Sequence, residues 1–434
     1  MFGGLAALVA AVATAWTPVF GLQIPVAHVP ADGYLSQIGV ADVTGDGIPD
    51  IVGARVTNAG ETHPLVVLAG NGKGGFRDVT TQVFSGPVTR TVLARHILFA
   101  DFNHDGRTDI FIADTGTDQN PYAGAPNELI LSAPGGKLVD ASGNLPPESG
   151  YTHAAAIGDV NHDGVPDLYI GNLCCGAPPE ILVNDGTGHF SRLANALPGA
   201  MSDVFNGPRY TAAIFADVNG DGWDDLVLAA EDHTPSSEVL LNDQHGHFVP
   251  LPGALPAKPF APNAIGLAAA PIDLNGDGHI DLVMAYTRGT PFYTGRWIQL
   301  LVNNGDGTFR DDTAARLPQA IDAPQWPDAL RIADLNGDGK PDIAVALDAF
   351  GAGDAAPVYL NRGDGTFTPL RVDSYNELDI TDVNGDGRPD IVSATATPGS
   401  PDTYAVNLQA GPTKAKPKPK PKQRCVKRPH HRCP

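Results

Sequence analysis

Several features that mark other protein classes are scarce or missing in this chain of 434 residues. Beyond the first twenty positions, the apolar residues show no sustained helical spacing. The sequence contains no nucleophile elbow, zinc motif or phosphate-binding loop. No apolar run is long enough to cross a membrane as a helix. These absences argue against a helical protein, a membrane-spanning protein and the enzyme classes that those motifs define.

Cysteine is also rare, and its 4 copies form two close pairs, Cys174–Cys175 and Cys425–Cys433. Even pairing is consistent with an oxidising compartment. Adjacent Cα atoms lie only about 3.8 Å apart, so a bridge between Cys174 and Cys175 would be strained. Two free thiols are the alternative for this pair, and the sequence leaves both possibilities open.

Basic residues are scarce outside the C-terminal segment. Nine lie between Lys414 and Arg432, so the rest of the chain carries 19 basic against 49 acidic residues, a net charge of −30. A body this acidic will not bind nucleic acid without bridging cations, and it is better suited to hold positive ions. Residues 412–434 alternate Lys with Pro and are predicted to form an extended, disordered basic tail. This tail either contacts an anionic cell-wall polymer, contacts the protein's own acidic body or stays free in solution.

The N-terminal residues 1–17 combine an apolar run with small residues at its end, which is typical of a signal peptide. No Lys or Arg precedes the run, and a buried strand or a disordered leader is the alternative. The signal-peptide interpretation predicts a secreted or cell-surface protein.

Glycine and proline are abundant, with 50 and 39 copies, which suits many short strands joined by turns. A pattern of Asp-x-(Asn or Thr)-x-Asp-Gly-x-x-Asp-(Ile or Leu) recurs seven times, at intervals of 48 to 61 residues. Each copy lies between two short apolar runs, and a third run, a Gly-rich turn closed by Phe and a fourth run follow. Four strands per repeat correspond to one blade of a β-propeller.

The two ends of the repeat array complement each other. The last repeat lacks the Gly-rich turn and its Phe, whereas Phe20 and residues 22–26 precede the first repeat. An N-terminal strand would therefore complete the last blade and close the ring, which protects strand edges better than a linear solenoid does. The predicted fold of residues 18–411 is an all-β, seven-bladed β-propeller of four-stranded blades.

The motifs DVNHDGVPDL (159–168) and DLNGDGKPDI (334–343), with NNGDGTF (303–309), resemble FG-GAP or VCBS-type repeats. The resemblance covers roughly residues 18 to 410. It implies a propeller like that of integrin α-subunits, of secreted bacterial proteins and of lectins. A calcium-binding module for cell adhesion or carbohydrate binding is therefore expected, although the same fold also carries polysaccharide lyases.

Oxygen-bearing residues occupy alternate positions of each motif, as a calcium-binding loop requires. Positions one, three, five and nine supply side-chain oxygens, position seven supplies a main-chain carbonyl, and the Gly at position six permits the bend. The predicted ligands are Asp42, Thr44, Asp46, Ile48, Asp50, Asp101, Asn103, Asp105, Arg107, Asp109, Asp159, Asn161, Asp163, Val165, Asp167, Asp217, Asn219, Asp221, Trp223, Asp225, Asp273, Asn275, Asp277, His279, Asp281, Asp334, Asn336, Asp338, Lys340, Asp342, Asp382, Asn384, Asp386, Arg388 and Asp390. Up to seven structural Ca²⁺ ions are expected, and a metal-free Asp-Gly turn is the alternative. Dissociation constants on the order of 10⁻⁴ to 10⁻³ M would suffice outside cells.

The connections between the second and third strands are expected on the face opposite these loops. They span residues 114–128, 171–180, 231–238 and 286–297 and mix aromatic with hydrogen-bonding side chains. The notable residues are Asp118, Asn120, Tyr122, Glu231, Asp232, His233, Tyr286, Arg288, Tyr293 and Arg296. This mixture suits a glycan or an extracellular protein ligand, and ordinary solvated loops are the alternative.

A polysaccharide lyase is the second functional hypothesis, with its active site on the same face. A His–Tyr pair can serve as general base and acid. The candidate catalytic residues are His96, His153, Arg209, Tyr210, His233 and Tyr286. An acidic substrate would further need a basic cluster, for which Arg209, Arg288 and Arg296 are candidates. Because no motif fixes their geometry, a binding or adhesion module is the preferred prediction.

Overall fold

The computed structural model describes residues 20–26, 34–57, 60–174, 176–261, 263–317, 326–348, 356–372, 377–395 and 403–409. The leader 1–17, the basic tail 412–434 and three of the four cysteines (Cys175, Cys425 and Cys433) lie outside these residues, so the predictions made for them stay predictions. No described helix is long and apolar enough to cross a membrane.

Seven four-stranded antiparallel sheets make up most of the described chain, together with one two-stranded sheet. Six of the seven are built from strands that follow one another in sequence. These are β2 (Tyr34–Ala41), β3 (Asp50–Val56), β5 (Val66–Gly70) and β6 (Phe76–Asp78); β8 (Ala94–Ala100), β9 (Asp109–Asp114), β10 (Glu128–Ala133) and β11 (Lys137–Asp140); β12 (Thr152–Gly158), β13 (Asp167–Asn172), β14 (Glu180–Asn184) and β15 (Phe190–Arg192); β16 (Tyr210–Ala216), β17 (Asp225–Ala230), β18 (Glu238–Asn242) and β19 (Phe248–Pro250); β20 (Ala264–Ile272), β21 (Asp281–Arg288), β22 (Thr294–Asn303) and β23 (Phe309–Asp311); β24 (Trp326–Ala333), β25 (Asp342–Asp348), β26 (Ala356–Asn361) and β27 (Phe367–Val372).

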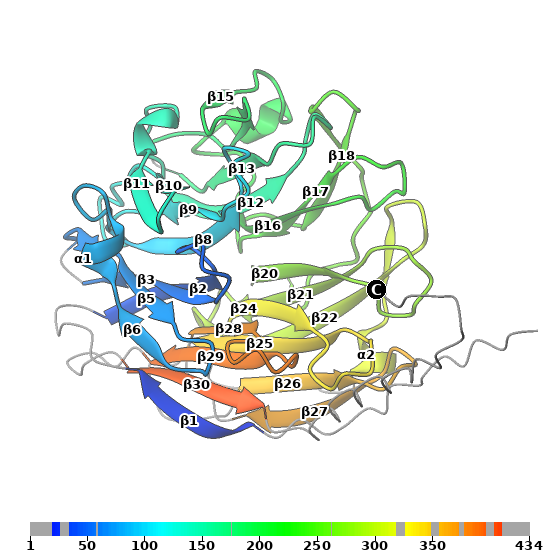
Figure 1. Cartoon of the computed structure of the whole chain (residues 1–434). Coiled ribbons are helices and arrows are strands. Elements are labelled where there is room, and N and C mark those ends of the chain that lie inside the picture. Colours follow the sequence, from blue (N-terminus) through cyan, green and yellow to red (C-terminus); the bar gives the residue numbers. More distant parts are fainter. Residues whose placement is uncertain are drawn as a thin grey trace, which may run out of the picture.

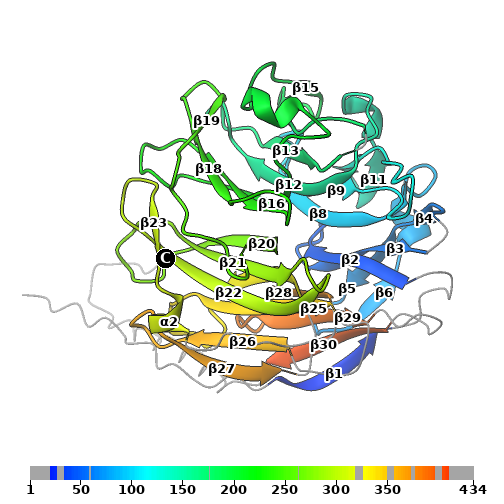
Figure 2. The ribbon, with the colours of Figure 1, turned by 180° about the vertical axis from the view of Figure 1, so that it is seen from behind.

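The remaining four-stranded sheet joins the two ends of the described chain. Its strands are β28 (Glu377–Thr381), β29 (Asp390–Thr395), β30 (Thr403–Gln409) and β1 (Phe20–Val26), and β1 pairs antiparallel with β30. Figures 1 and 2 show the blue β1 beside the orange and red strands. The predicted pairing of the N-terminal strand with the last repeat is therefore present.

Short elements fill the connections, one of them inside the first sheet, between β3 and β5, and the others between successive sheets. They are β4 (His63–Pro64), β7 (Arg90–Thr91), α1 (Thr80–Val83), α2 (Thr313–Arg316) and the 3₁₀ turns Ser142–Asn144 and Gly199–Ser202. Each helix has only three or four residues, in keeping with the absence of helical periodicity in the sequence.

The sheets are arranged in a ring around a central axis (Figure 1). The first strands of successive sheets contact one another in the order β2, β8, β12, β16, β20, β24 and β28, and β28 contacts β2 in turn. The prediction of an all-β propeller is confirmed.

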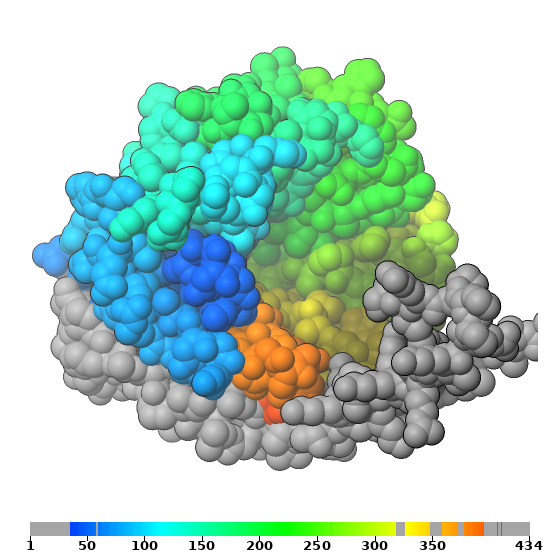
Figure 3. Space-filling view, viewed as in Figure 1, coloured from blue at the N-terminus to red at the C-terminus, as the bar shows by residue number. Residues whose placement is uncertain are grey.

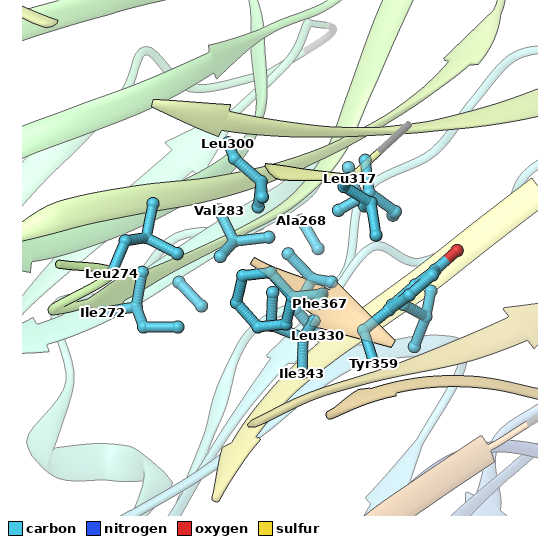
Figure 4. Close-up of a cluster of buried hydrophobic side chains, with 14 of the residues drawn as sticks. Ala268, Ile272, Leu274, Val283, Leu300, Leu317, Leu330, Ile343, Tyr359 and Phe367 are labelled. Atoms are coloured by element: carbon cyan, nitrogen blue, oxygen red, sulfur yellow. The ribbon is translucent and has the colours of Figure 1, made fainter. Parts of the chain in front are cut away.

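The hydrophobic core is divided into seven clusters, each between two neighbouring sheets. Between the fifth and sixth sheets, for example, Leu274, Val283 and Leu300 pack against Ile343 and Phe367 (Figure 4). Each such side chain contributes on the order of 1.5–3 kcal/mol when fully buried. Because the clusters lie between sheets, stability depends on each sheet having a neighbour on both sides.

Strand direction separates the turns into two faces. In an antiparallel sheet, consecutive connections lie at opposite ends, so the motif loops occupy one face and the connections from the second to the third strand occupy the other. The surface is recessed at the centre of the ring in Figure 3. The two candidate sites lie on these two faces.

Candidate cation loops and axial pocket

All seven motif loops, which we call the Asp loops, share one pattern of hydrogen bonds. In the fourth loop, the carboxylate of Asp217 accepts bonds from the backbone N–H groups of Gly220, Asp221 and Gly222 at 2.7–3.1 Å. The carboxylate of Asp221 accepts one from the N–H of Trp223 at 3.0 Å. Equivalent bonds recur in the other six loops. The first and fifth side chains thus fold each loop around its own oxygen atoms.

The ninth position of each Asp loop is fully buried and ties three strands together. In the same loop, Asp225 accepts a bond from the N–H of Val218 through Oδ2 and one from the N–H of Asn242, on the third strand, through Oδ1. The equivalent Asp residues are all 0% exposed and make the same two bonds. This position is therefore part of the fold as well as a predicted ligand.

The donor set of the Asp loops fits a hard cation. Ca²⁺ prefers oxygen ligands. In the fourth loop, Oδ2 of Asp217, Oδ1 of Asp221 and both carboxylate oxygens of Asp225 each accept a single backbone N–H, which leaves a second lone pair on each for a cation. Burial, together with the charges of the other Asp residues of each loop, raises the pKa of Asp167 and of Asp342 to about 7. A cation in the loop would favour the charged form of these carboxylates.

Two details of the Asp loops go beyond the sequence prediction. Arg107 and Arg388, expected to contribute only their carbonyls, also pair through their guanidinium groups with the carboxylates of Asp105 and Asp386. His104 and His162 occupy position four with positive φ angles of 58° and 60°, and both side chains are exposed, as expected for residues that point away from the loop. Such angles are usually left to glycine.

The opposite face contains a pocket of about 780 Å³ on the ring axis, which we call the axial pocket. All seven sheets contribute to its lining. Among the residues that line it are Ser36, Gln37, Arg95, Asp118, Tyr122, Tyr151, His153, Arg209, Thr211, Glu231, Leu267, Phe292, Tyr293, Trp326, Asp328 and Glu377. Its volume is within the range of small-molecule sites.

A β-bulge in the first strand of six sheets directs a side chain toward the axial pocket. Each strand pair shifts register around one unpaired residue, and that residue lines the pocket in every case. The six are Ser36, Arg95, His153, Thr211, Leu267 and Asp328. Bulges commonly re-aim side chains beside functional sites. The six side chains differ in charge, size and polarity, so the pocket has no rotational symmetry.

Ion pairs and hydrogen bonds organise the charged groups of the axial pocket. Arg95 pairs with Asp118 at 3.0 Å, and Asp118 also accepts a bond from the hydroxyl of Tyr151. Asp328 accepts a bond from the side-chain amide of Gln37 at 3.2 Å. Burial, together with the charge of Arg95, lowers the pKa of His153 well below its usual value, so this imidazole is neutral at pH 7.

Two groups of stacked rings form walls of the axial pocket. Tyr151 packs against Tyr122 and His153, with ring centroids 5.9 and 4.6 Å apart. Tyr293 packs against Phe292 at 4.4 Å and Trp326 at 5.3 Å. Tyr122 and Phe292 are 45% and 69% exposed, which leaves parts of both rings open to a ligand.

The six candidate catalytic residues are not brought together. Only His153 and Arg209 line the axial pocket within the described part of the chain. Tyr210 and Tyr286 are buried in β16 and β21, at 2% and 1% exposure, and His96 hydrogen-bonds the carbonyl of His153 at 2.9 Å. His233 is exposed and lies against Glu231 and Asp232, forming a small group of possible cation ligands at the pocket edge. The predicted His–Tyr acid–base pair is thus not formed by these candidates.

The predicted basic cluster of Arg209, Arg288 and Arg296 is also not formed in this pocket. Strands β21 and β22 are longer than expected, which shortens the connection to residues 289–293 and moves Tyr286, Arg288 and Arg296 into strands. Arg288 lies over the ring of Phe260 at 4.3 Å, and Arg296 is 6% exposed. Of the three arginines, Arg209 alone is among the described lining residues.

Cys174 lines the axial pocket and is disulfide-bonded, which excludes the free-thiol alternative for this residue. Its partner is not among the described residues, because Cys174 is the single cysteine that they include.

Sequence reasoning missed five lining residues, all within two positions of the start of a first strand: Arg95, Tyr151, Trp326, Asp328 and Glu377. A signal was present: each of the six bulge residues stands six positions before the first Asp of its motif. The residues at that position share no chemistry, so alignment on the motif would be needed to reveal them.

Comparisons with known proteins agree with the propeller fold. Among solved structures, one of an Agrocybe aegerita lectin, described as recognising non-reducing terminal N-acetylglucosamine, has 19% identity and a TM-score of 0.49, over 78% of this chain and 80% of that chain. Another, of BBS1N in complex with ARL6DN and soaked with lead, has 11% identity and a TM-score of 0.51, over 92% of this chain and 99% of that chain. At such identity the second likeness concerns the fold alone. A search of curated proteins finds no match.

A family model described as an FG-GAP-like repeat matches residues 42–112, 101–170, 217–284 and 273–345. The matched segments together span more than half of the chain and contain six of the seven Asp loops. The chain belongs to the FG-GAP repeat family.

Proposed function

We propose that this protein is an extracellular, calcium-stabilised propeller that binds a glycan in its axial pocket. The observation that carries the proposal is the set of six bulges, each of which directs a different side chain into one pocket. The bulge itself recurs with the repeat, whereas the residue that it directs into the pocket differs from sheet to sheet. The unlike side chains favour a single asymmetric ligand over a site repeated in each blade.

The mixture of rings and polar groups favours a glycan. Partly exposed aromatic rings such as Tyr122 and Phe292 offer flat apolar surfaces for sugar rings, while Arg95, Asp118 and Asp328 offer hydrogen bonds to hydroxyl groups. The backbone carbonyl of Phe205 accepts a hydrogen bond from the guanidinium of Arg209, which lines the pocket. Phe205 itself is 76% exposed. The apolar surface therefore extends beyond the pocket edge, as a ligand longer than one sugar would require.

We infer that each Asp loop holds one Ca²⁺ with a structural role. The ligands would be the side chains at positions one, three, five and nine and the carbonyl at position seven, all of them oxygen donors. The bound ion would offset the mutual repulsion of three carboxylates per loop. It would also fasten the first two strands of each sheet to each other.

We further infer that the composite sheet of β28, β29, β30 and β1 serves as a seventh blade that closes the ring. The support is its contact with both neighbours: Asp379 pairs with Arg331 of the sixth sheet and accepts a bond from the N–H of Val40 in the first. Ring closure between the two ends of the chain would restrict unfolding from either end.

The proposal is tested with the purified full chain, in calcium, on an array of neutral, acidic and amino polysaccharides. Retention of a glycan class by the wild type, and its loss in Trp326→Ala, is the expected result. Asp306→Asn, which removes a carboxylate from a β22–β23 turn on the other face, is the matched control and should bind normally. Growth of ultraviolet absorbance from unsaturated uronates would identify a lyase instead. Binding to no glycan would overturn the proposal and leave an extracellular protein ligand to be sought.

A further inference from the structure

The axial pocket has an excess of negative charge. Four carboxylates line it, those of Asp118, Glu231, Asp328 and Glu377, against two guanidinium groups. One guanidinium, that of Arg95, is already paired with Asp118. The neutral state of His153 adds no positive charge at pH 7. An anionic sugar would therefore meet net repulsion in this pocket.

Three of these acids share the pocket with one aromatic residue, Tyr293. Asp118 follows β9, Glu231 follows β17 and Asp328 lies in β24, so they come from three different sheets. The pKa of Tyr293 is raised by burial and also by the charges of Asp118, Asp328 and Glu231, while Arg95 opposes this shift. Tyr293 lines the same pocket as these three carboxylates, and its phenol lies within their electrostatic reach.

Aromatic rings stand beside these carboxylates. Tyr293 packs edge-on to Trp326, which is two residues before Asp328 in β24. Tyr151, whose hydroxyl bonds Asp118, packs against Tyr122 on the other wall. Ring faces attract cations, and the attraction strengthens when the cation is removed from water. Carboxylates next to ring faces make an environment that favours a cation over a neutral group of equal size.

We propose that the axial pocket selects a glycan that carries protonated amino groups, with Asp328 and Glu231 holding an ammonium group against the rings of Tyr293 and Trp326. This inference rests on the proposed glycan-binding function and specifies its ligand class. Asp328 suits the role because Arg95 pairs with Asp118 and not with Asp328. Glu231 contacts the exposed ring of His233 at 3.1 Å, and an ammonium group would take the place of that imidazole. Asp328 has the amide of Gln37 as its hydrogen-bond partner, which leaves lone pairs for a further donor.

The test compares three hexasaccharides of similar size by titration calorimetry at mildly acidic pH: one of glucosamine, one of N-acetylglucosamine and one of galacturonate. The wild type should bind the glucosamine hexamer at least about tenfold more tightly than the acetylated one, a difference of about 1.4 kcal/mol, and should not bind the galacturonate. The affinity should fall as the ionic strength approaches ~1 M, because salt screens ion pairs. Asp328→Asn and Glu231→Gln should each remove most of the preference, and the control Asp306→Asn should keep it.

A fourth probe, hexalysine, separates the failure of this inference from the failure of the glycan proposal. Equal binding of the amino and acetylated hexamers, lost in Trp326→Ala, would keep the glycan function and overturn the charge selection. Binding of hexalysine but of no saccharide would keep the selection for cations and overturn the glycan function. Preference for galacturonate, or binding of none of the four probes, would overturn the selection for an amino sugar outright. Wild-type thermal melting in each variant shows that a lost preference is not caused by unfolding.

Discussion

The two faces of the ring are built by the same strands but follow opposite rules. On the face of the Asp loops, each sheet repeats the same carboxylates with the same hydrogen bonds. On the face of the axial pocket, the six bulge residues occupy equivalent places and share no chemistry. Residues that each sheet needs in order to fold are expected to be the same in every sheet. Residues from several sheets that together form one recognition site are expected to differ. The contrast suggests that stability and binding are carried by separate faces.

The largest expected effect is the removal of calcium, which would act on all the Asp loops together. A ligand at a hundredfold excess over its Kd stabilises the folded state by about 2.7 kcal/mol per site. We expect EDTA to lower the Tm by at least ~10 °C, and added Ca²⁺ to restore it. Scanning calorimetry of the full chain measures the change. An unchanged Tm would mean that the loops are metal-free turns and that only one face has a ligand.

Removal of strand β1 is expected to have the next largest effect, because it unpairs β30 in the composite sheet. Deletion of residues 20–26 should lower the Tm by ~5 °C or more and should promote association through the exposed edge. Thermal melting and size-exclusion chromatography at several concentrations measure the two effects. A variant that melts and elutes like the wild type would show that this pairing does not close the ring.

Two positions of one Asp loop should respond differently to calcium. Asp225→Ala leaves the buried N–H groups of Val218 and Asn242 without acceptors, so we expect about 3 kcal/mol of destabilisation with or without Ca²⁺. Asp221→Ala removes an exposed carboxylate, and we expect its effect to shrink in EDTA to the small cost of the lost bond from the N–H of Trp223. Urea unfolding of both variants in each buffer measures the difference. Equal calcium dependence of the two variants would contradict the dual role of the ninth position.

The sequence predicts the residues of the Asp-loop face more completely than those of the axial pocket, and the reason is physical. The fold and the Asp loops follow from short patterns that repeat along the chain. The pairing of Phe20 to Val26 with the last repeat follows from the turn and strand that this repeat lacks. Asp118, Tyr122, Glu231 and Tyr293 were also expected on the face where they lie, because connections alternate between faces. Strand ends were harder, since nothing local marks where β21 and β22 stop pairing, and Tyr286 was misplaced for that reason.

The bulges set a stronger limit on the sequence analysis. A bulge is a property of the register between two strands, and in the six sheets it falls on Ser, Arg, His, Thr, Leu and Asp. No residue type marks the bulge position. That the six bulge residues all lie around one pocket becomes visible only when the strands are paired in three dimensions. The same diversity that makes the pocket selective removes the repeat signal that would have revealed it.

The smallest effect on stability is expected from the bulge residues, and this sharpens the contrast between the faces. Thr211→Val keeps the volume of the side chain but removes the hydroxyl that bonds the carbonyl of Gly266 in the next sheet, whereas Leu267→Ala removes only apolar surface at the pocket. We expect Leu267→Ala to shift the Tm by no more than ~2 °C and Thr211→Val by somewhat more, because the first makes no hydrogen bond through its side chain. Both should alter binding of the preferred hexasaccharide, as measured by the same titration. A large loss of stability in Leu267→Ala, with binding unchanged, would assign the bulges to folding and would remove the division of labour between the two faces.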